Sequence, residues 1–257
     1  MEKKKKGVMQ SIPGWAWVLI SLAVAILLWY VLSINPKTAR SFPFIPAILE
    51  AAKRMIDNGA LGQDFCSSMI SILAGFALGF ITAVPIAFLM AWYLPVRGVL
   101  EPWIRNIPPL AYVPLVVITA GVGRKPQIIV IWIATFLIMT VTIYQGVRNI
   151  DNTLVKAARV LGAKDRDIFV KVIFPATTPF ILTAVRLGIS VALTTLIAAE
   201  TTGATAGLGM RIRSLANSFE TAGMLMYIII IGIIGLVMEK IIKFLEGRLT
   251  GWQEKRE

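Results

Sequence analysis

Histidine is absent from the 257 residues, and the single cysteine is Cys66. The lack of histidine excludes Ser-His-Asp and Cys-His catalysis and removes the commonest metal ligand. One cysteine allows neither an internal disulfide nor a cysteine-rich metal site. The phosphate-binding pattern G-x-x-x-x-G-K-[ST] is also missing, so this chain does not bind ATP by that route. We therefore expect no catalytic residue, no cofactor and no metal site.

Charge is scarce as well. Only 16% of the residues are charged and 57% are hydrophobic, with a mean hydropathy of +0.76, whereas a soluble domain has about a quarter of its residues charged. The apolar residues form long uncharged runs, and the loops between them are too short for a second soluble core. The sequence predicts an all-α integral membrane protein that forms one domain over residues 1–257.

Six apolar runs are predicted to cross the bilayer, since a spanning helix needs about 20 mostly apolar residues. The third run carries Pro108, Pro109 and Pro114 and is expected to be a broken or tilted span. The first run has an alternative as a cleaved signal peptide behind Lys3 to Lys6, but it is long and no A-x-A site follows. The predicted spans are 15–33, 68–93, 107–121, 127–144, 175–199 and 222–245.

The net charge of +12 has two interpretations. It could serve nucleic-acid binding, or it could follow the positive-inside rule of membrane loops. The second fits better because the basic residues lie beside the apolar runs and gather at Lys3 to Lys6, in 146–174 and in the C-terminal tail. We expect a multi-pass protein with both termini in the cytoplasm and no nucleic-acid partner.

Two local patterns predict packing. Apolar residues recur at helical spacing in 44–61, which predicts a short amphipathic helix that either lies on the outer membrane surface or is a solvated connector. Gly75 and Gly79 form a G-x-x-x-G pair, which predicts close packing of the second span against another helix.

The loop 146–174 predicts a helix, a sharp bend at Gly162 and a second helix that Asp165 or Asp167 could cap. Pro175 would open the next span. Small alanines on this loop would let the surface of another protein approach closely, as a mechanical coupling element requires. From periodicity alone, an ordinary connecting hairpin is an equally good interpretation.

The same loop resembles the E-A-A–x3–G–x9–I–x–L–P signature of binding-protein-dependent ABC importer permeases. Here the pattern reads Lys156-Ala157-Ala158, Gly162, and then Val172, Phe174 and Pro175. Lys156 replaces the acid of the signature. The segments 107–115, 198–200 and 207–209 extend the resemblance, from the first span to Trp252, to the subgroup that serves sulfonates, taurine, nitrate and some vitamin precursors.

The resemblance implies a permease with an importer-type fold in the bacterial cytoplasmic membrane, acting on a small polar or anionic solute. Its implied partners are a second copy of itself, a cytoplasmic ATP-binding subunit and an extracytoplasmic solute-binding protein. Neither a cofactor nor enzymatic activity is implied for the chain. The implied contacts to the ATPase are Lys156, Ala157, Ala158, Leu161, Gly162 and Ala163.

Residues in or near the spans are candidates for the translocation path, because ionisable groups and broken helices in a bilayer usually serve a pathway or a partner. Arg186 either binds an anion in the path or has a structural role in which it pairs with backbone or a loop carboxylate. Glu200 is either a gate or a solvated interfacial acid, and Thr194 either lines the path or bonds back to its own helix. The candidates are Pro108, Pro114, Arg186, Thr194 and Glu200.

An ion-coupled secondary transporter is the alternative function. Such proteins usually contain an internal repeat and need a coupling-ion site. The two halves of this sequence show no repeat, and few acids lie within the apolar runs.

Overall fold

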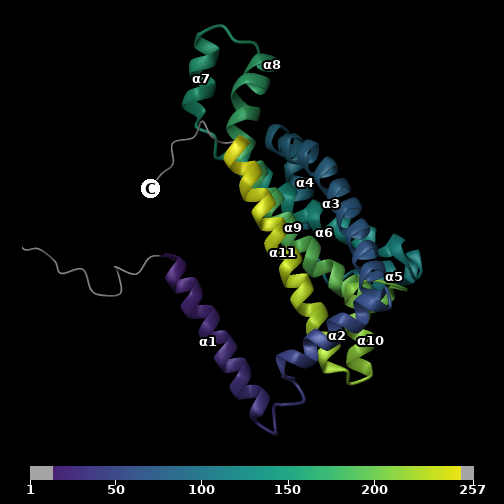
Figure 1. Cartoon of the computed structure of the whole chain (residues 1–257). Helices are drawn as coiled ribbons and strands as arrows, with labels where there is room; N and C mark the ends of the chain where they lie inside the picture. The colour runs from purple at the N-terminus through teal and green to yellow at the C-terminus, as the bar shows by residue number, and fades with distance from the viewer. Residues whose placement is uncertain (1–13, 250–257) are drawn as a thin grey trace, which may run out of the picture.

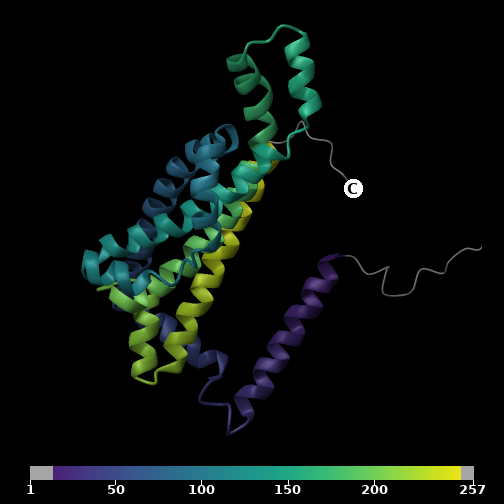
Figure 2. The same ribbon diagram turned by 180° about the vertical axis from the view of Figure 1, so that it is seen from behind.

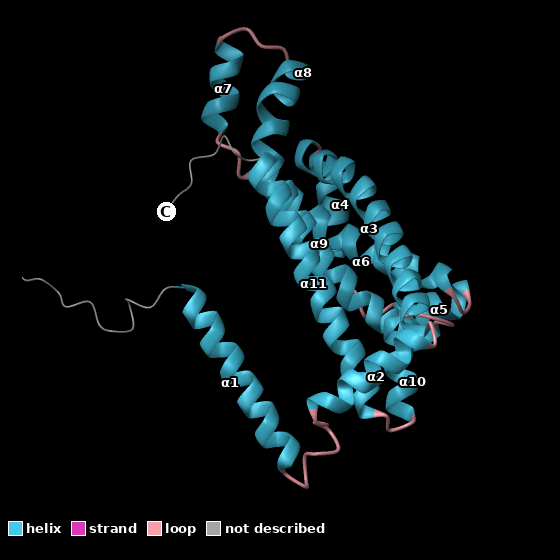
Figure 3. Ribbon diagram, in the orientation of Figure 1, coloured by secondary structure: helices cyan, strands magenta, loops and turns pink. Residues whose placement is uncertain are grey.

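A computed structural model describes residues 14–249, and within that range every regular element is helical (Figures 1 and 3). The all-α prediction is confirmed. Lys3 to Lys6 and Trp252 lie outside the described residues. The elements are α1 (Gly14–Ile34), α2 (Ile45–Asp57), α3 (Ala60–Trp92), α4 (Leu94–Asn106), α5 (Val113–Ala120), α6 (Arg124–Arg148), α7 (Asn152–Val160), α8 (Asp165–Ile168), the π-helical turn η2 (Phe169–Ile173), α9 (Phe174–Gly203), α10 (Leu208–Asn217) and α11 (Thr221–Leu249).

The helices α3 and α6 run parallel in the centre of the bundle. Ser71 donates a 2.8 Å hydrogen bond to Gln127 near the start of α6, and farther along both helices Trp132 donates a 3.1 Å bond to Thr82. The helix α9 runs antiparallel to α3, because its last turns reach the first turns of α3. We call the end where α7 and α8 project from the bundle the hairpin end, and the other the opposite end (Figure 1).

Glycines allow this parallel pair to pack closely. A Cβ on Gly75 would lie 2.7 Å from Cβ of Ile131, and a Cβ on Gly79 would collide with the side chain of Thr135. Such contacts are closer than side chains tolerate, so only glycine lets the two backbones approach this far. The packing predicted from the G-x-x-x-G pair is confirmed.

Residues 107–121 do not form one spanning helix. Residues 107–112 are non-helical, and α5 has 8 residues, or about 12 Å, against a hydrocarbon core of about 30 Å. Pro108 and Pro109 supply no N–H for helix bonds, and Pro114 lies in the first turn of the new helix, where proline is tolerated. Since α3 and α6 are parallel, residues 93–123 nevertheless return the chain from the hairpin end to the opposite end.

Four helical stretches in the described part are long and apolar enough to span a membrane: Ala60–Trp92, Arg124–Arg148, Asp165–Gly203 and Thr221–Arg248. The first helix contributes a shorter apolar stretch, Leu19–Ile34. These stretches lie where five of the six spans were predicted, and the predicted span at 107–121 is the one without a helix long enough to cross the membrane.

The helix α2 is the amphipathic helix expected in 44–61. Ile48 and Ala51 are buried, and Ile48 packs in a cluster with residues of α10 and α11, while Arg54 pairs with Glu220 at 3.0 Å. The helix therefore rests with its apolar face on the opposite end of the bundle.

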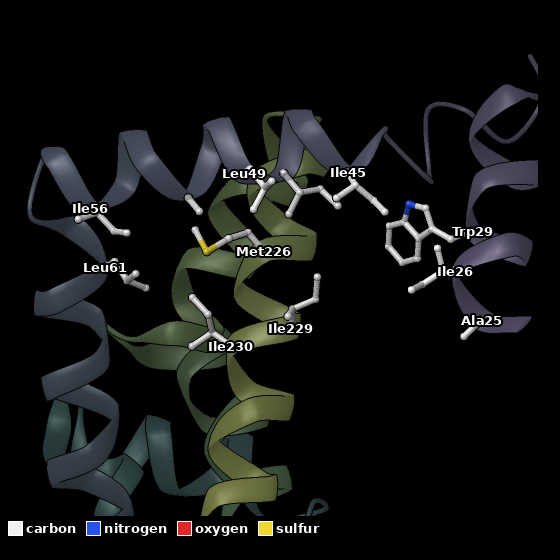
Figure 4. A pocket seen from close by; sticks show the side chains of 12 residues that line it. Ala25, Ile26, Trp29, Ile45, Leu49, Ile56, Leu61, Met226, Ile229 and Ile230 are labelled. Carbon is white, nitrogen blue, oxygen red and sulfur yellow. The ribbon is translucent and has the colours of Figure 1, made fainter. Parts of the chain in front are cut away.

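The helix α1 stands apart from the other helices in both views (Figures 1 and 2). It is tied to the following loop by Trp29, whose indole N–H donates to the carbonyl of Pro43 at 3.0 Å. Between α1, α2 and α11 lies a groove of about 470 Å³ whose lining side chains, including Trp29, Leu49 and Met226, are all apolar (Figure 4). Nothing in this groove could recognise a polar solute.

Candidate functional site

The projecting hairpin, residues 151–168, begins with a capped helix. The carboxylate of Asp151 accepts a 2.8 Å bond from the backbone N–H of Thr153, as a helix N-cap does. That backbone bond, with smaller help from Lys156, lowers the pKa of Asp151. The cap therefore stays charged, and the start of α7 is fixed locally.

Gly162 ends the same helix by its backbone geometry. Its φ is +82°, in the left-handed region that glycine adopts without a steric penalty. Its N–H donates to the carbonyl of Arg159 at 2.9 Å, and the N–H of Ala163 donates to that of Ala158 at 3.0 Å. These two bonds form a Schellman motif, and the bend predicted at Gly162 is therefore confirmed.

The second arm of the hairpin continues into the membrane bundle. The helix α8 passes through η2 into α9, so that residues 165–203 form one continuous helical stretch. Phe169 packs edge-on against Phe88 and Trp92, with ring centroids 5.3 and 5.6 Å away. A displacement of the hairpin would therefore reach α9 directly.

Aspartates do not cap this second arm. The residue at its N-cap is Lys164, which makes no side-chain cap bond, and Asp165 lies in the first turn. Asp165 instead lies 3.5 Å from Arg159 across the bend. The capping prediction was wrong because the first helical residue is Asp165 itself, one position too late to act as the cap.

The candidate contacts to the ATPase fall on two sides of the hairpin. Ala157 is exposed, as are Lys156 and Gly162, and Leu161 is 87% exposed. Ala158 and Ala163 instead pack against the apolar cluster that contains Ile168 and Ile173 of the second arm. The outward apolar surface comprises Leu154, Ala157, Val160 and Leu161. The spacing Leu154, Ala157, Leu161 marks this face, but sequence reasoning missed Val160.

On α9, a row of hydroxyl-bearing residues faces outward. Thr183, Ser190 and Thr194 are exposed, and each hydroxyl donates to a carbonyl four residues earlier in the same helix, at 3.0 to 3.3 Å. The back-bonding alternative for Thr194 is confirmed. Back-bonding satisfies each hydroxyl proton within the helix and leaves lone pairs on the exposed side.

Arg186 pairs with Glu246 of α11. The pairing alternative for Arg186 is therefore observed. Its guanidinium also lines a cavity of about 420 Å³ together with Ser190 and Glu239, and its Nε is buried without a hydrogen-bond partner.

Glu200 is enclosed inside the bundle, with 1% of its surface exposed, and is not a solvated interfacial acid. Ser68 donates to one carboxylate oxygen at 2.6 Å, and the N–H of Gly209 donates to the other at 2.7 Å. The solvated-acid alternative for Glu200 was wrong because the chain folds back after Gly203 and places the start of α10 over the carboxylate.

A second buried carboxylate, Asp64, also binds the N-terminal end of α10. It accepts bonds from the N–H of Gly207 at 3.1 Å, from Nε of Arg211 at 2.8 Å and from the hydroxyl of Tyr227 at 2.9 Å. The bond to Asp64 raises the pKa of Arg211. We call Asp64 and Glu200 the carboxylate clamp. Negative charge is favoured at a helix N-terminus, and sequence reasoning missed Asp64 because it precedes the predicted span.

The proline segment lies beside the clamp. Pro108 and Pro114 are exposed, and α5, which holds Pro114 in its first turn, packs on the end of α9. There the N–H of Gly123 donates to the carbonyl of Gly203 at 2.9 Å, and Val117 fills the space beside Gly203. The structure thus brings the broken segment close to Glu200, but it does not bring the five path candidates into one cavity.

Comparison with known proteins identifies the family of this chain. Residues 75–251 match the family model of the binding-protein-dependent transport system inner membrane component. The chain belongs to this family. A probable ABC transporter permease protein of Brucella abortus (strain 2308) is 43% identical over 92% of this chain and 95% of its own length. The taurine transport system permease protein TauC of Escherichia coli (strain K12) is 34% identical over 76% of this chain and 72% of its own.

The fold of this permease is shared with a chain from the inward-facing MetNI methionine ABC transporter. The TM-score is 0.64 at 15% identity, covering 74% of this chain and 95% of that one. Further relatives carry the names of aliphatic sulfonate and nitrate permeases. The chain is a multi-pass membrane permease of the type I importer fold, in a family whose members are transport subunits and not enzymes. Membership implies an ATP-binding subunit and a solute-binding protein as partners.

Proposed function

We propose that this permease imports a small polar or anionic solute of the sulfonate, taurine, nitrate or vitamin-precursor type, driven by an ATPase on a separate subunit. The relatives named for taurine, aliphatic sulfonates and nitrate support the solute class. The permease acts as a homodimer in the bacterial cytoplasmic membrane. Residues 93–123 form the third of six crossings, which leaves both termini and the hairpin end in the cytoplasm.

The observation that carries the coupling proposal is the exposed tip of the hairpin. Val160 and Leu161 are each 87% exposed although both are apolar, and they lie at the Schellman bend. Exposed apolar side chains on a projecting, locally rigid element are typical of a surface that a partner covers. The ATPase receives this tip in a groove, and the continuous helix from α8 to α9 carries the movement into the bundle.

The translocation path follows the exposed hydroxyl row of α9. Thr183, Ser190 and Thr194 face outward from a helix whose exposed residues also include the apolar Phe174 and Leu187. In the dimer this row faces the second copy across an aqueous path, with Arg186 toward the hairpin end and α5 toward the opposite end, and the broken segment with Pro108 and Pro114 borders the same path. Glu200 holds α10 and does not itself touch the solute.

The test replaces Leu161 with Asp in the permease co-expressed with its ATPase. A buried charge at the docking surface should reduce ATPase co-purification and solute uptake about tenfold or more. Asn152→Asp adds the same charge at the exposed root of α7 and should change neither. Unchanged co-purification and uptake in Leu161→Asp would contradict the coupling role. Uptake driven by an ion gradient without the ATPase would instead favour the secondary transporter.

A further inference from the structure

An arginine cluster lies at the hairpin end of the bundle, away from the docking tip. Arg97 and Arg105 of α4 flank Glu101, one turn away on either side, and Arg148 ends α6 beside them. Tyr144 connects the groups: its hydroxyl donates to Glu101 at 3.3 Å and accepts from Nη1 of Arg148 at 3.2 Å. Glu101 is therefore flanked by two guanidinium groups and is connected to the third through the hydroxyl of Tyr144.

The Glu101 carboxylate does not accept hydrogen bonds from the guanidinium groups of the cluster. The guanidinium groups of Arg97 and Arg105 lie 3.9 and 4.0 Å from Glu101, beyond hydrogen-bonding distance. Arg148 has no carboxylate within 4.0 Å among residues 14–249, and its guanidinium lies 5.8 Å from the centre of the Tyr144 ring. Three positive charges against one negative charge leave the cluster with a net charge of about +2, with donors free to bind a ligand.

A cavity opens at this cluster. It has a volume of about 360 Å³ and is lined by two of the arginines, by Glu101 and Tyr144, and by the side-chain amides of Gln145 and Asn149. Guanidinium and amide donors that converge on one hollow match the acceptor oxygens of a sulfate, sulfonate or phosphate group.

The position of the cavity brings it within reach of two sources of such a group. Trp92, Tyr93 and Trp103 are exposed on and just before α4, as is common at a membrane–water interface. A group could therefore come from an anionic lipid head group, which basic pockets at the ends of membrane helices bind. A soluble oxyanion could reach the same donors from water.

We propose that Arg97, Arg105 and Arg148 form an oxyanion-binding site at the hairpin end of this permease. Arg148 and Arg105 contact the oxyanion, Arg97 adds positive potential, and Glu101 weakens binding by repulsion. The site is separate from the hydroxyl row on α9 and from the docking tip, and it does not depend on the proposed solute or on ATPase coupling.

The test has a soluble arm and a lipid arm, both with the full-length chain. In detergent, the thermal unfolding midpoint is measured in sodium sulfate and in sodium chloride of equal ionic strength, since a ligand that binds the folded state raises it. In nanodiscs, retained phosphatidylglycerol is compared with retained phosphatidylcholine by native mass spectrometry. Arg148→Gln and Arg105→Gln are compared with Arg124→Gln, which removes an exposed arginine at the other end of α6.

Wild type and Arg124→Gln should bind the oxyanion, and each cluster variant should bind about tenfold more weakly. Glu101→Gln should bind more tightly, an effect that loss of structure would not produce. An effect in the sulfate arm identifies a soluble oxyanion, and an effect in the lipid arm alone identifies a head group. The proposal is overturned if the cluster variants match Arg124→Gln in both arms, or if Glu101→Gln weakens binding.

Discussion

Ser68 on α3 donates a 2.6 Å hydrogen bond to Glu200 on α9, 132 residues later in the chain, and both side chains are almost completely buried. The other oxygen of Glu200 receives the N–H of Gly209, in the first turn of α10. One carboxylate therefore joins α3, α9 and the start of α10.

Glu200→Ala should destabilise the permease by about 2–4 kcal/mol, because the hydroxyl of Ser68 and the N–H of Gly209 lose their buried acceptor. The measurement is thermal unfolding in detergent, together with proteolysis near Arg213 to report release of α10. A double-mutant cycle with Ser68→Ala should be non-additive, because both changes break the same bond. Additive effects would show that the two side chains act independently.

Gly162→Val should impair coupling, because valine at a φ of +82° costs about 1–2 kcal/mol and opposes the Schellman bend. Membrane insertion should be normal, while ATPase co-purification and uptake fall. Gly162→Asn is the matched control, because asparagine tolerates the left-handed region and should retain most of the uptake. Equal uptake by the two variants would mean that the backbone angle at Gly162 is unimportant.

Ala157→Trp and Ala158→Trp should fail for different reasons. Ala158 packs against the apolar cluster that contains Ile168, so tryptophan there should overpack it by about 1–3 kcal/mol and lower the unfolding midpoint. Ala157 is exposed, so tryptophan there should leave the midpoint unchanged and block ATPase docking. Thermal unfolding and co-purification distinguish the two, and both variants should lose uptake. Wild-type docking and uptake in Ala157→Trp would remove this face from the proposed interface.

Cysteine labelling tests the orientation. In a Cys66→Ser background, single cysteines replace Asn58, at the end of α2, and Asp165, in the hairpin; both positions are exposed. A membrane-impermeant thiol reagent added outside intact cells should label position 58, and position 165 should react only after permeabilisation. The reverse pattern would place the hairpin outside and exclude a cytoplasmic ATPase contact.

Gly75→Leu should separate α3 from α6, because even a Cβ there would lie 2.7 Å from Ile131. Overpacking of about 1–3 kcal/mol or more is expected, seen as a lower unfolding midpoint and reduced yield of folded protein. Gly232→Leu on α11 is the control, because nothing lies within 4 Å of its added Cβ, and it should leave the midpoint nearly unchanged. If both variants unfold alike, close packing at Gly75 is not what stabilises the pair.

The sequence alone determined the features that depend on neighbouring residues. Long uncharged runs require a bilayer whatever the packing, so the membrane class and the helical fold followed from composition. The bend at Gly162 followed from a glycine after a periodic segment, since a helix end is set within a few residues. The close approach at Gly75 followed from two glycines one turn apart. The sequence did not, however, identify α6 as the helix that packs there.

Only the tertiary structure decided the features that join distant segments. The burial of Glu200 depends on Ser68 and on the fold-back of α10, and the pairing of Arg186 with Glu246 joins residues 60 positions apart. Periodicity placed Ala157 and Ala158 together, but the packing of α7 against α8 and η2 turned one outward and the other inward. Residue type and spacing record neither the partner nor the depth of burial, because both arise only when the helices pack.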